Sequence, residues 1–334
     1  MSAPAISVLI DTYNYGKYVE QAIESVLQQD FPTAEREILV IDDGSTDDTP
    51  ERVEKYGLAI TYLRKPNGGQ ASAFNCGLER ARGKIVAFLD ADDYWLPGKL
   101  QRLADEFERH PEAGMVYHQL RYRYESADRL EDGNGPLISG FLPANSSDLL
   151  AYECFPTSFL AFRRSVLRVL LPIPNELTIM ADAYVSRLVL FLAPVVALPE
   201  ILAVYRLHGS NLFWSAGQME KGRQLVRSQA TIALARSWRR WLRERGYDLE
   251  RPDLQTLFLH WQLEVEKARF ALRHPSNLRF CRHLLRSTKT FGARKNWKHR
   301  AVTYLNAAGS LFVGYQKAGR LDEWRMGVKR ALFG

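Results

Sequence analysis

The sequence predicts an α/β protein with a mainly parallel sheet flanked by helices, followed by an all-helical C-terminal region. Over the first hundred residues, short apolar β-branched runs alternate with amphipathic segments, which is the pattern of βαβ units. From about Ser215 onward, only helical periodicity remains. The chain has 334 residues, 46% of them hydrophobic and 25% charged, which suits two or three globular domains. This composition excludes a disordered, collagen-like or coiled-coil rod protein.

The elements of residues 1–110 follow from their hydrophobic patterns. The predicted strands are Ile6–Ile10, Ile38–Ile41, Thr61–Leu63 and Ile85–Leu89. The predicted helices are Tyr18–Gln29, Thr49–Tyr56, Ala71–Ala81 and Lys99–His110. Apolar residues at helical spacing favour these helices, and Thr49-Pro50-Glu51 is a typical helix start. Ligands of such sheets bind beyond the carboxyl ends of the strands.

Residues 111–214 have a less regular pattern, because prolines between Pro136 and Pro174 mark loops. The pattern predicts one helix here, Met180–Phe191. It also predicts two short strands, Val195–Ala197 and Ile201–His208.

The segment 215–334 differs from the rest in both pattern and charge. The apolar stripe of its first predicted helix is Leu225, Ile232, Ala235, Trp238 and Leu242. Further helices are predicted at Leu254–Leu272, Asn277–Thr290 and Val302–Tyr315. Residues 1–214 hold 20 Lys and Arg against 29 Asp and Glu, a net charge of −9, whereas residues 215–334 hold 25 against 9, a net charge of +16. Two parts with different roles are therefore expected.

Several features favour a cytoplasmic location. The three cysteines are far apart and form no Cys-x-x-Cys pair, which predicts reduced thiols. The N-terminus has no basic region of the kind that opens a secretory signal. The longest apolar run, Leu188–Leu198, has 11 residues and contains a proline, whereas a membrane-spanning helix needs about 20.

Acidic residues stand where three of the predicted strands end. Asp11 ends the first strand, Asp42-Asp43 the second, and Asp90-Ala91-Asp92-Asp93 the fourth. Strands of one parallel sheet bring these ends to one edge, where like charges repel unless a cation or hydrogen-bond donors offset them. Asp90 and Asp92, two residues apart in extended chain, would point to the same side. Such a pair suits Mg²⁺ or Mn²⁺, which also bridges diphosphate oxygens. The alternative is an acidic turn that caps the helix near Lys99.

The segment Asp42–Asp47 has two interpretations. Gly44 permits a sharp turn, and Ser, Thr and Asp favour turns and helix caps, so a plain structural turn is the simpler interpretation. The other is a nucleotide site, in which a carboxylate accepts a hydrogen bond from a base. Other nucleotide and hydrolase signatures fail: no P-loop, GxGxxG, zinc spacing or GxSxG elbow is present.

Five blocks in order resemble family-two glycosyltransferases. They are Ser7–Asn14, Ser25–Gln29, Ile41–Asp47, the stretch Asn67–Gln70 with Asn75, Gly77, Ala81 and Gly83, and Phe88–Asp93. The resemblance covers about 100 residues, weakens through the middle and is not seen after about residue 215. It implies a GT-A fold and inverting transfer from a nucleotide sugar, in cell-surface polysaccharide or glycolipid synthesis. It also implies a nucleotide-sugar-binding region 1–110 and an acceptor and catalytic-base region 111–214 of the same domain, which the basic helical region 215–334 follows.

The resemblance also implies roles for single residues at the strand ends. Asp11 and Tyr13 would lie near the nucleotide base, and Asp43 would accept a hydrogen bond from it. Asp90 would approach the ribose or the metal, and Asp92 would be the direct ligand of a divalent cation, Mn²⁺ or Mg²⁺. Asp11 departs from the family pattern, where an uncharged residue is usual, so the donor's identity stays open.

Later in the chain, the resemblance points to a catalytic base and to a second metal contact. Met180–Tyr184 matches the family segment that supplies the base, with Asp182 at the position of the base and Ala181 in place of the usual first acid. Tyr205–Asn211 matches a Tyr-Arg-x-His segment, in which His208 would contact the metal or diphosphate. As alternatives, Asp182 is an ordinary acid at a helix start, and His208 is a structural histidine. Pro156–Ser158 would form the floor of the acceptor site, or an ordinary loop.

The basic C-terminal region has three interpretations. Its arginines, including Arg236, Arg239, Arg240 and Arg243, would form a solvated helical face, or bind anionic lipid head groups together with nearby tryptophans, or bind nucleic acid. Nucleic acid is the least favoured, so the expected partners are a nucleotide-sugar donor, a saccharide or lipid-linked acceptor, and an anionic membrane surface on the inner face of the plasma membrane.

Two other functions compete with sugar transfer: a non-catalytic nucleotide-sugar-binding scaffold that has lost base function, and a nucleotidyltransferase.

Overall fold

The computed structural model describes residues 4–133, 135, 137–141, 155–211, 221–251 and 254. Their contacts divide the chain into two compact units, Met1–Trp214 and Ser215–Gly334. Of the predicted C-terminal helices, Leu254–Leu272 beyond its first residue, Asn277–Thr290 and Val302–Tyr315 lie outside the described residues.

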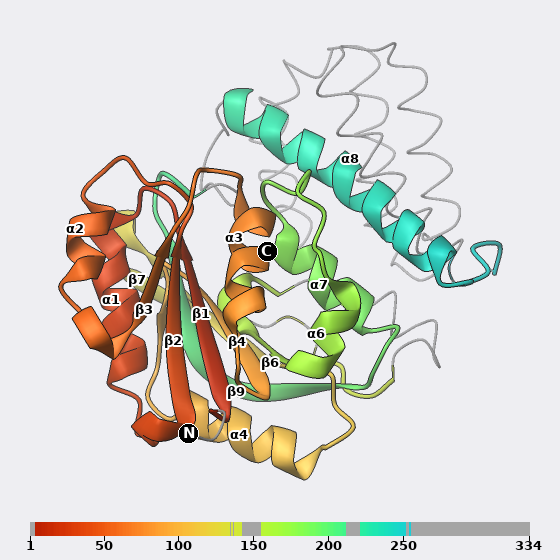
Figure 1. Ribbon diagram of the computed structural model, residues 1–334, viewed down its shortest axis with the longest axis horizontal. Coiled ribbons are helices and arrows are strands. Elements are labelled where there is room, and N and C mark those ends of the chain that lie inside the picture. Colours follow the sequence, from red (N-terminus) through yellow and green to blue (C-terminus); the bar gives the residue numbers. More distant parts are fainter. Residues whose placement is uncertain are drawn as a thin grey trace, which may run out of the picture. The chain divides into compact units, whose positions relative to one another are not determined.

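The first unit is a mixed sheet with helices packed against it (Figure 1). Its strands are β1 (Ile6–Thr12), β2 (Arg36–Asp42), β3 (Thr61–Arg64), β4 (Ile85–Asp90), β5 (Tyr94–Trp95), β6 (Met115–Tyr124), β7 (Arg129–Asp132), β8 (Leu160–Arg163) and β9 (Val195–Leu207). Its α-helices are α1 (Gly16–Leu27), α2 (Thr49–Glu54), α3 (Gln70–Arg80), α4 (Lys99–Arg109), α6 (Arg164–Leu170) and α7 (Ala181–Val189). Its short 3₁₀ turns include η5 (Thr157–Phe159).

The strand order, among the described residues, is β3-β2-β1-β4-β8-β6-β9-β5, with β7 paired to β6. The half formed by β3, β2, β1 and β4 is wholly parallel. The antiparallel strand β8 joins β4 to β6, which in turn pairs in parallel with the long strand β9. The predicted α/β fold with a largely parallel sheet is therefore confirmed, and the antiparallel pairings lie in the second half of the unit.

The parallel half forms the core because its central strands are apolar on both faces. Every residue of β4 before Asp90 is buried, as are five successive residues of β1, 6–10. Helix α3 packs closely against this half: a Cβ atom on Gly77 would lie 2.4 Å from a methyl of Leu9, so only glycine allows the approach. Two-sided burial is typical of parallel strands between helices, and explains why short uninterrupted apolar runs predicted them.

The prediction of two short strands near residue 200 is wrong, because β9 runs without a break from Val195 to Leu207. Its register against β6 shifts where His118 pairs with Leu198 and Gln119 pairs with Ile201, so Pro199 and Glu200 have no partner in the ladder. Proline has no amide hydrogen to donate, and this bulge accommodates it within one strand.

In the second unit, the structure describes helix α8 (Lys221–Glu244) and the turn after it. Leu225, predicted to be buried, is 45% exposed. The buried stripe is shifted and consists of Ala230, Leu234, Trp238, Trp241 and Leu242. Of the predicted stripe, Trp238 and Leu242 are buried, Ile232 and Ala235 are half-buried, and the prediction for Leu225 is wrong. Arg236, Arg239, Arg240 and Arg243 are exposed.

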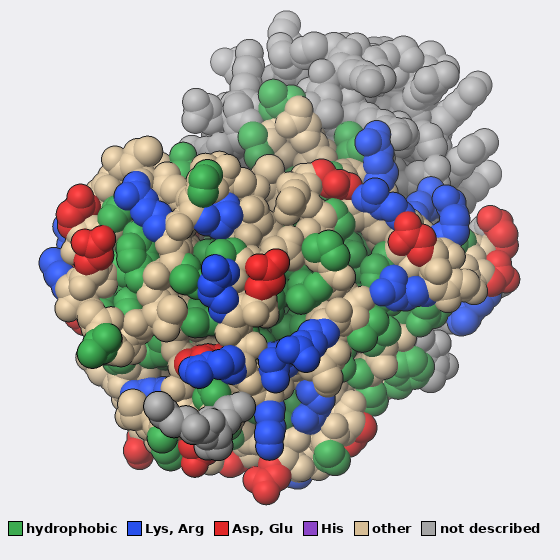
Figure 2. All heavy atoms as spheres, in the orientation of Figure 1, with side chains coloured by type: hydrophobic (Ala, Val, Ile, Leu, Met, Phe, Trp, Pro, Cys, Tyr) green, Lys and Arg blue, Asp and Glu red, His purple; other side chains and the backbone are tan. Residues whose placement is uncertain are grey.

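Figure 2 shows one face of the molecule, on which Lys and Arg side chains gather around the lower ends of α3 and α6. This is the end of the sheet at which β1 begins (Figure 1). Within the described part of the chain, no helix is both long and apolar enough to cross a bilayer.

Candidate active site at the carboxyl edge of the sheet

The acidic strand ends meet at one edge of the sheet. Asp11 in β1 lies opposite Asp90 in β4, and Thr12 lies opposite Asp42 at the end of β2. The register of a parallel sheet alone produces this arrangement, because each strand delivers its last residues to the same edge.

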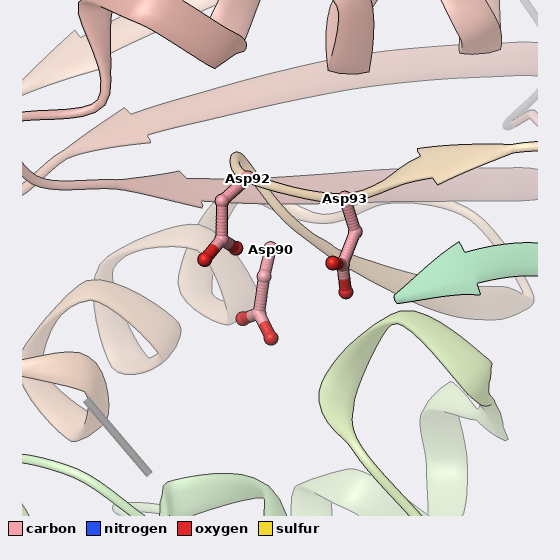
Figure 3. Close-up of side chains that lie close together, drawn as sticks. All are labelled: Asp90, Asp92 and Asp93. Carbon is pink, nitrogen blue, oxygen red and sulfur yellow. The ribbon is translucent and has the colours of Figure 1, made fainter. Parts of the chain in front are cut away.

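Three carboxylates cluster just beyond β4. Oxygen atoms of Asp90, Asp92 and Asp93 all lie within 4.8 Å of one another, and Figure 3 shows the three side chains turned to the same side of the chain. Asp92 is 7% exposed and Asp93 is fully buried. Helix α4 begins after Gly98 without a side-chain cap. The alternative that these acids merely cap α4 is therefore wrong.

Burial and mutual repulsion raise the pKa values of several of these carboxyl groups. Burial raises the pKa of Asp11 to about 7, although a hydrogen bond shared with Asp90 lowers it in part. Burial, then the charges of Asp11 and Asp92, hold the pKa of Asp90 well above its usual range. The Oδ1 atom of Asp11 is buried and has no hydrogen-bond partner among the described residues. An oxygen-rich, electron-rich cluster with an unsatisfied atom fits a hard divalent cation.

The raised pKa of Asp11 predicts how stability depends on pH when no metal is bound. The folded protein holds a proton that the unfolded chain releases, so stability falls as pH rises from the ordinary value of 3.8 to about 7. We expect the melting temperature in EDTA to fall more steeply over this range for the wild type than for Asp11→Asn. Calorimetry at several pH values measures this, and parallel curves for the two proteins would contradict it.

The proposed nucleotide contacts differ in exposure. Tyr13 follows β1 and is 44% exposed, whereas Asp43 is 4% exposed. The Asp43 carboxylate accepts hydrogen bonds from Lys65 Nζ at 2.6 Å and from the amides of Gly68 and Gly69 at 3.0 and 2.6 Å. Asp43 therefore anchors the loop before α3. A carboxylate accepts up to about four hydrogen bonds, so these three donors leave room for one more. The contact of Asp43 with a base stays a prediction. Lys65 was not found from the sequence.

Asp47, the last residue of the turn after β2, has a structural role. Asp47 accepts hydrogen bonds from the amides of Gly16 at 3.0 Å and Thr49 at 3.1 Å, which joins the starts of α1 and α2. The structural interpretation of this turn is thus correct for Asp47.

Asp182 lies in the first turn of α7, and a small network orients its carboxylate. Thr157 Oγ1 donates to Asp182 Oδ2 at 3.2 Å, and Gln70 Nε2 donates to Thr157 Oγ1 at 3.3 Å. Gln70 Oε1 also accepts the amide of Ala181 at 2.9 Å. Burial raises the pKa of Asp182, and its charge in turn raises the pKa of Asp11 and Asp90. Asp182, on a different element, therefore lies near the acidic edge of the sheet.

The loop before α7 is held close to the loop before α3. Gly69 has φ +82°, and a Cβ atom there would lie 2.5 Å from Thr178 Cα, so only glycine fits. The amide of Gln70 donates to the carbonyl of Thr178 at 2.9 Å. Met180, directly before α7, has φ +68°, which is strained for a residue with a side chain.

The end of β9 and the residues after it contact the acidic cluster. His208 Nε2 lies 2.9 Å from Asp92 Oδ2, and Asn211 Nδ2 donates to the same oxygen at 3.3 Å. Arg206 Nε donates to the carbonyl of Asp92 at 2.8 Å. The structure thus brings together Asp92 and His208, the two residues predicted to contact a metal.

Two tyrosines lie near the site: Tyr205, which opens the Tyr-Arg-x-His segment, and Tyr15, which was not found from the sequence. Burial, then the charges of Asp92 and Asp90, raise the pKa of Tyr15, and burial with the charges of Asp93, Asp92, Asp90 and Asp182 raises that of Tyr205. Tyrosine is common in cores, and no motif marks Tyr15. Only the fold places the two hydroxyls beside the carboxylates.

Comparison with known proteins identifies the class of protein. The family described as Glycosyl transferase family 2 matches residues 7–171. An uncharacterized glycosyltransferase of Nostoc is 38% identical over 241 residues, which cover 70% of this chain and 74% of the relative. The chain belongs to glycosyltransferase family 2, and the predicted resemblance is confirmed.

More distant relatives include a protein whose name states its activity. TarS of Staphylococcus aureus, a poly(ribitol-phosphate) beta-N-acetylglucosaminyltransferase, is 39% identical over 108 residues, which are 31% of this chain and 19% of TarS. An uncharacterized protein of Mycobacterium tuberculosis is 31% identical over 219 residues, 63% of this chain and 61% of that protein.

Solved structures share the fold. The crystal structure of S. aureus TarS in complex with UDP-GlcNAc superimposes with a TM-score of 0.61 and 22% identity, covering 96% of this chain and 92% of the other. A mannosyltransferase of Pyrobaculum calidifontis in complex with GDP-Man and Mn²⁺ gives a TM-score of 0.54 and 19% identity, covering 98% and 87%. The GT-A-like fold is therefore confirmed.

Proposed function

We propose that this protein transfers a sugar from a nucleoside-diphosphate sugar to an acceptor hydroxyl by a single displacement that inverts the anomeric centre. The observation that carries the proposal is the position of Asp182 on α7, near enough to the carboxylates that end β1 and β4 for its charge to raise the pKa of Asp11 and Asp90. An inverting displacement needs a base on the acceptor side and charge stabilisation on the side of the leaving group. We assign Asp182 to the first role and the carboxylates at the strand ends to the second.

Each group has a separate role in the proposal. Asp182, oriented by Thr157, accepts the proton of the acceptor hydroxyl. Asp92 and His208 would hold Mn²⁺ or Mg²⁺, and a bound cation would offset the charge that develops on the leaving nucleoside diphosphate. The mannosyltransferase with the same fold is complexed with Mn²⁺, which supports this choice of cation.

The donor would lie along the parallel half of the sheet. Asp11 and Tyr13 would lie near the base, Asp43 would accept a hydrogen bond from it, and Asp90 would approach the ribose or the cation. The exposed ring of Tyr13 supports a contact with a flat ligand. Residues 111–214 would supply the acceptor side. We expect a saccharide or lipid-linked acceptor, in cell-surface polysaccharide or glycolipid synthesis.

The test is a panel of UDP- and GDP-sugars with Mn²⁺, read first by thermal shift and then by turnover. A donor that binds the folded state raises the melting temperature by mass action. Turnover that needs an acceptor supports the proposal, whereas binding without any turnover would favour the non-catalytic scaffold. Release of pyrophosphate would favour a nucleotidyltransferase.

We further propose that the protein works in the cytoplasm at an anionic membrane surface, which it contacts through the basic region 215–334. The exposed arginines of α8 support this proposal. Trp238 and Trp241 are only 4% and 5% exposed, so the attachment would be chiefly electrostatic.

Co-sedimentation with liposomes tests the membrane contact. The full chain is expected to bind vesicles with anionic lipid and not neutral vesicles, and binding should weaken with salt, because the Debye length falls from about 10 Å at 0.1 M to about 3 Å at 1 M. Replacing Arg236, Arg239, Arg240 and Arg243 by glutamine should also weaken the binding to anionic vesicles. Equal, negligible binding of the wild type to both kinds of vesicle would contradict the proposal.

A further inference from the structure

Asp93 is the most deeply buried of the three clustered carboxylates, and both of its oxygens already have partners. Ser158 Oγ donates to Asp93 Oδ2 at 2.6 Å, and the amide of Arg206 donates to Oδ1 at 2.9 Å. The side chain is fully buried. Its distance from Asp90 and Asp92 alone would make it a third metal ligand. Its hydrogen bonds point to a different role.

Ser158, in η5, connects Asp93 to the end of β4. Its hydroxyl donates to Asp93 and accepts the amide of Asp90 at 3.1 Å, so one side chain holds both residues. Its carbonyl accepts a hydrogen bond from Lys99 Nζ at 2.6 Å. Lys99 is fully buried, with its ammonium group 4.3 Å from the centre of the Trp95 ring. The buried Lys99 side chain therefore holds the backbone of Ser158 in place.

Arg206 fixes the same turn from β9. Its amide donates to Asp93 and its Nε to the carbonyl of Asp92. Its guanidinium also donates to Gln21 Oε1 at 2.6 Å and lies 4.7 Å from the centre of the Tyr18 ring. The turn from Asp90 to Asp93 is thus held by two elements that are remote in sequence.

We propose that Asp93 is a positioning residue and not a ligand of the cation: with Ser158 it clamps the turn after β4, so that Asp92, and Asp90 beside it, keep their carboxylates aimed at the metal. The inference rests on the proposed function, since it concerns the same cation. Partners of this kind typically change metal affinity by about 10- to 100-fold when they are removed.

The critical variant is Ser158→Ala, because it removes the clamp without removing any possible metal ligand. Binding of Mn²⁺ to the full chain is followed by the electron paramagnetic resonance of free Mn²⁺, with UDP present and, in parallel, with GDP. We expect Ser158→Ala to weaken Mn²⁺ binding by about tenfold. The control Ser165→Ala changes an exposed serine of α6 and should bind like the wild type.

Asp93→Ala provides a second, independent test. If Asp93 acts through the clamp, adding Ser158→Ala to Asp93→Ala weakens Mn²⁺ binding little further, because both changes break one interaction. A ligand role predicts instead that Asp93→Ala has a far larger effect than Ser158→Ala and that the two effects add.

The outcomes separate this inference from the proposed function. If the wild type binds Mn²⁺, Asp92→Ala does not, and Ser158→Ala binds like the wild type, the clamp is wrong while the metal site stands. If the wild type does not bind Mn²⁺ with either nucleotide, the metal part of the proposed function and the clamp both fail.

Discussion

Asp182→Asn is expected to lower the turnover number for sugar transfer by about 10²- to 10⁴-fold, the usual contribution of a general base. Asparagine keeps the size of the side chain: its Oδ1 can still accept the amide of Ala183, and its Nδ2 can donate to Thr157 Oγ1, so the loop should keep its shape. It cannot accept the proton of the acceptor hydroxyl. Donor affinity, measured by calorimetric titration without acceptor, should stay close to that of the wild type.

The matched control is Asp30→Asn, since Asp30 is an exposed acid after α1 and away from the sheet edge. It should transfer sugar like the wild type.

The wild-type rate should also depend on pH. Burial raises the pKa of Asp182, and a base acts only when it is deprotonated, so the rate should already fall at a pH above the ordinary pKa range of an aspartate. Wild-type turnover by a folded Asp182→Asn protein would remove Asp182 from the proton transfer.

Asp92→Ala is expected to abolish the part of nucleotide affinity that depends on metal. The substitution removes the carboxylate that lies 2.9 Å from His208 Nε2. We expect titrations of nucleoside diphosphate with Mn²⁺ and with EDTA to give the same weak affinity for this variant, whereas the wild type binds more tightly with Mn²⁺. Asp30→Ala serves as the control.

An unchanged Mn²⁺ dependence in folded Asp92→Ala would place the cation elsewhere. A parallel His208→Ala variant separates the two proposed ligands. A smaller loss for that variant is expected, because Asn211 still holds Asp92.

The parallel half of the sheet was predictable because its strands are buried on both faces. Residues such as Val8 and Leu9, next to each other in β1, are both fully buried, so the strand appears as an unbroken apolar run. The acidic residues at the strand ends then followed from the register of neighbouring parallel strands. Local pattern and tertiary structure agree in this region.

The second half was not predictable in the same way. β6 carries Arg121 and Arg123 among aromatic residues, and its outer half is only partly buried, so no apolar run marks it. The break expected near Pro199 was wrong because a bulge in the pairing with β6 accommodates the proline. In both cases the outcome depends on partner strands that are distant in sequence.

The site residues also fall into those that a local sequence pattern predicts and those whose roles depend on distant elements. The acids and Asp182 could be predicted because they belong to motifs. Lys65, Gln70, Thr157 and Ser158 could not be assigned their roles, because each acts through a hydrogen bond to a residue on another element. Which hydroxyl or ammonium group meets which carboxylate is decided by packing.

The most direct test of the central claim is to identify both products of one turnover. The purified full chain is incubated with Mn²⁺, an acceptor and the donor found in the screen, and the new glycosidic bond is assigned by NMR. We predict a free nucleoside diphosphate and a product whose anomeric configuration is opposite to that of the donor. Retained configuration, or release of pyrophosphate, would contradict the account.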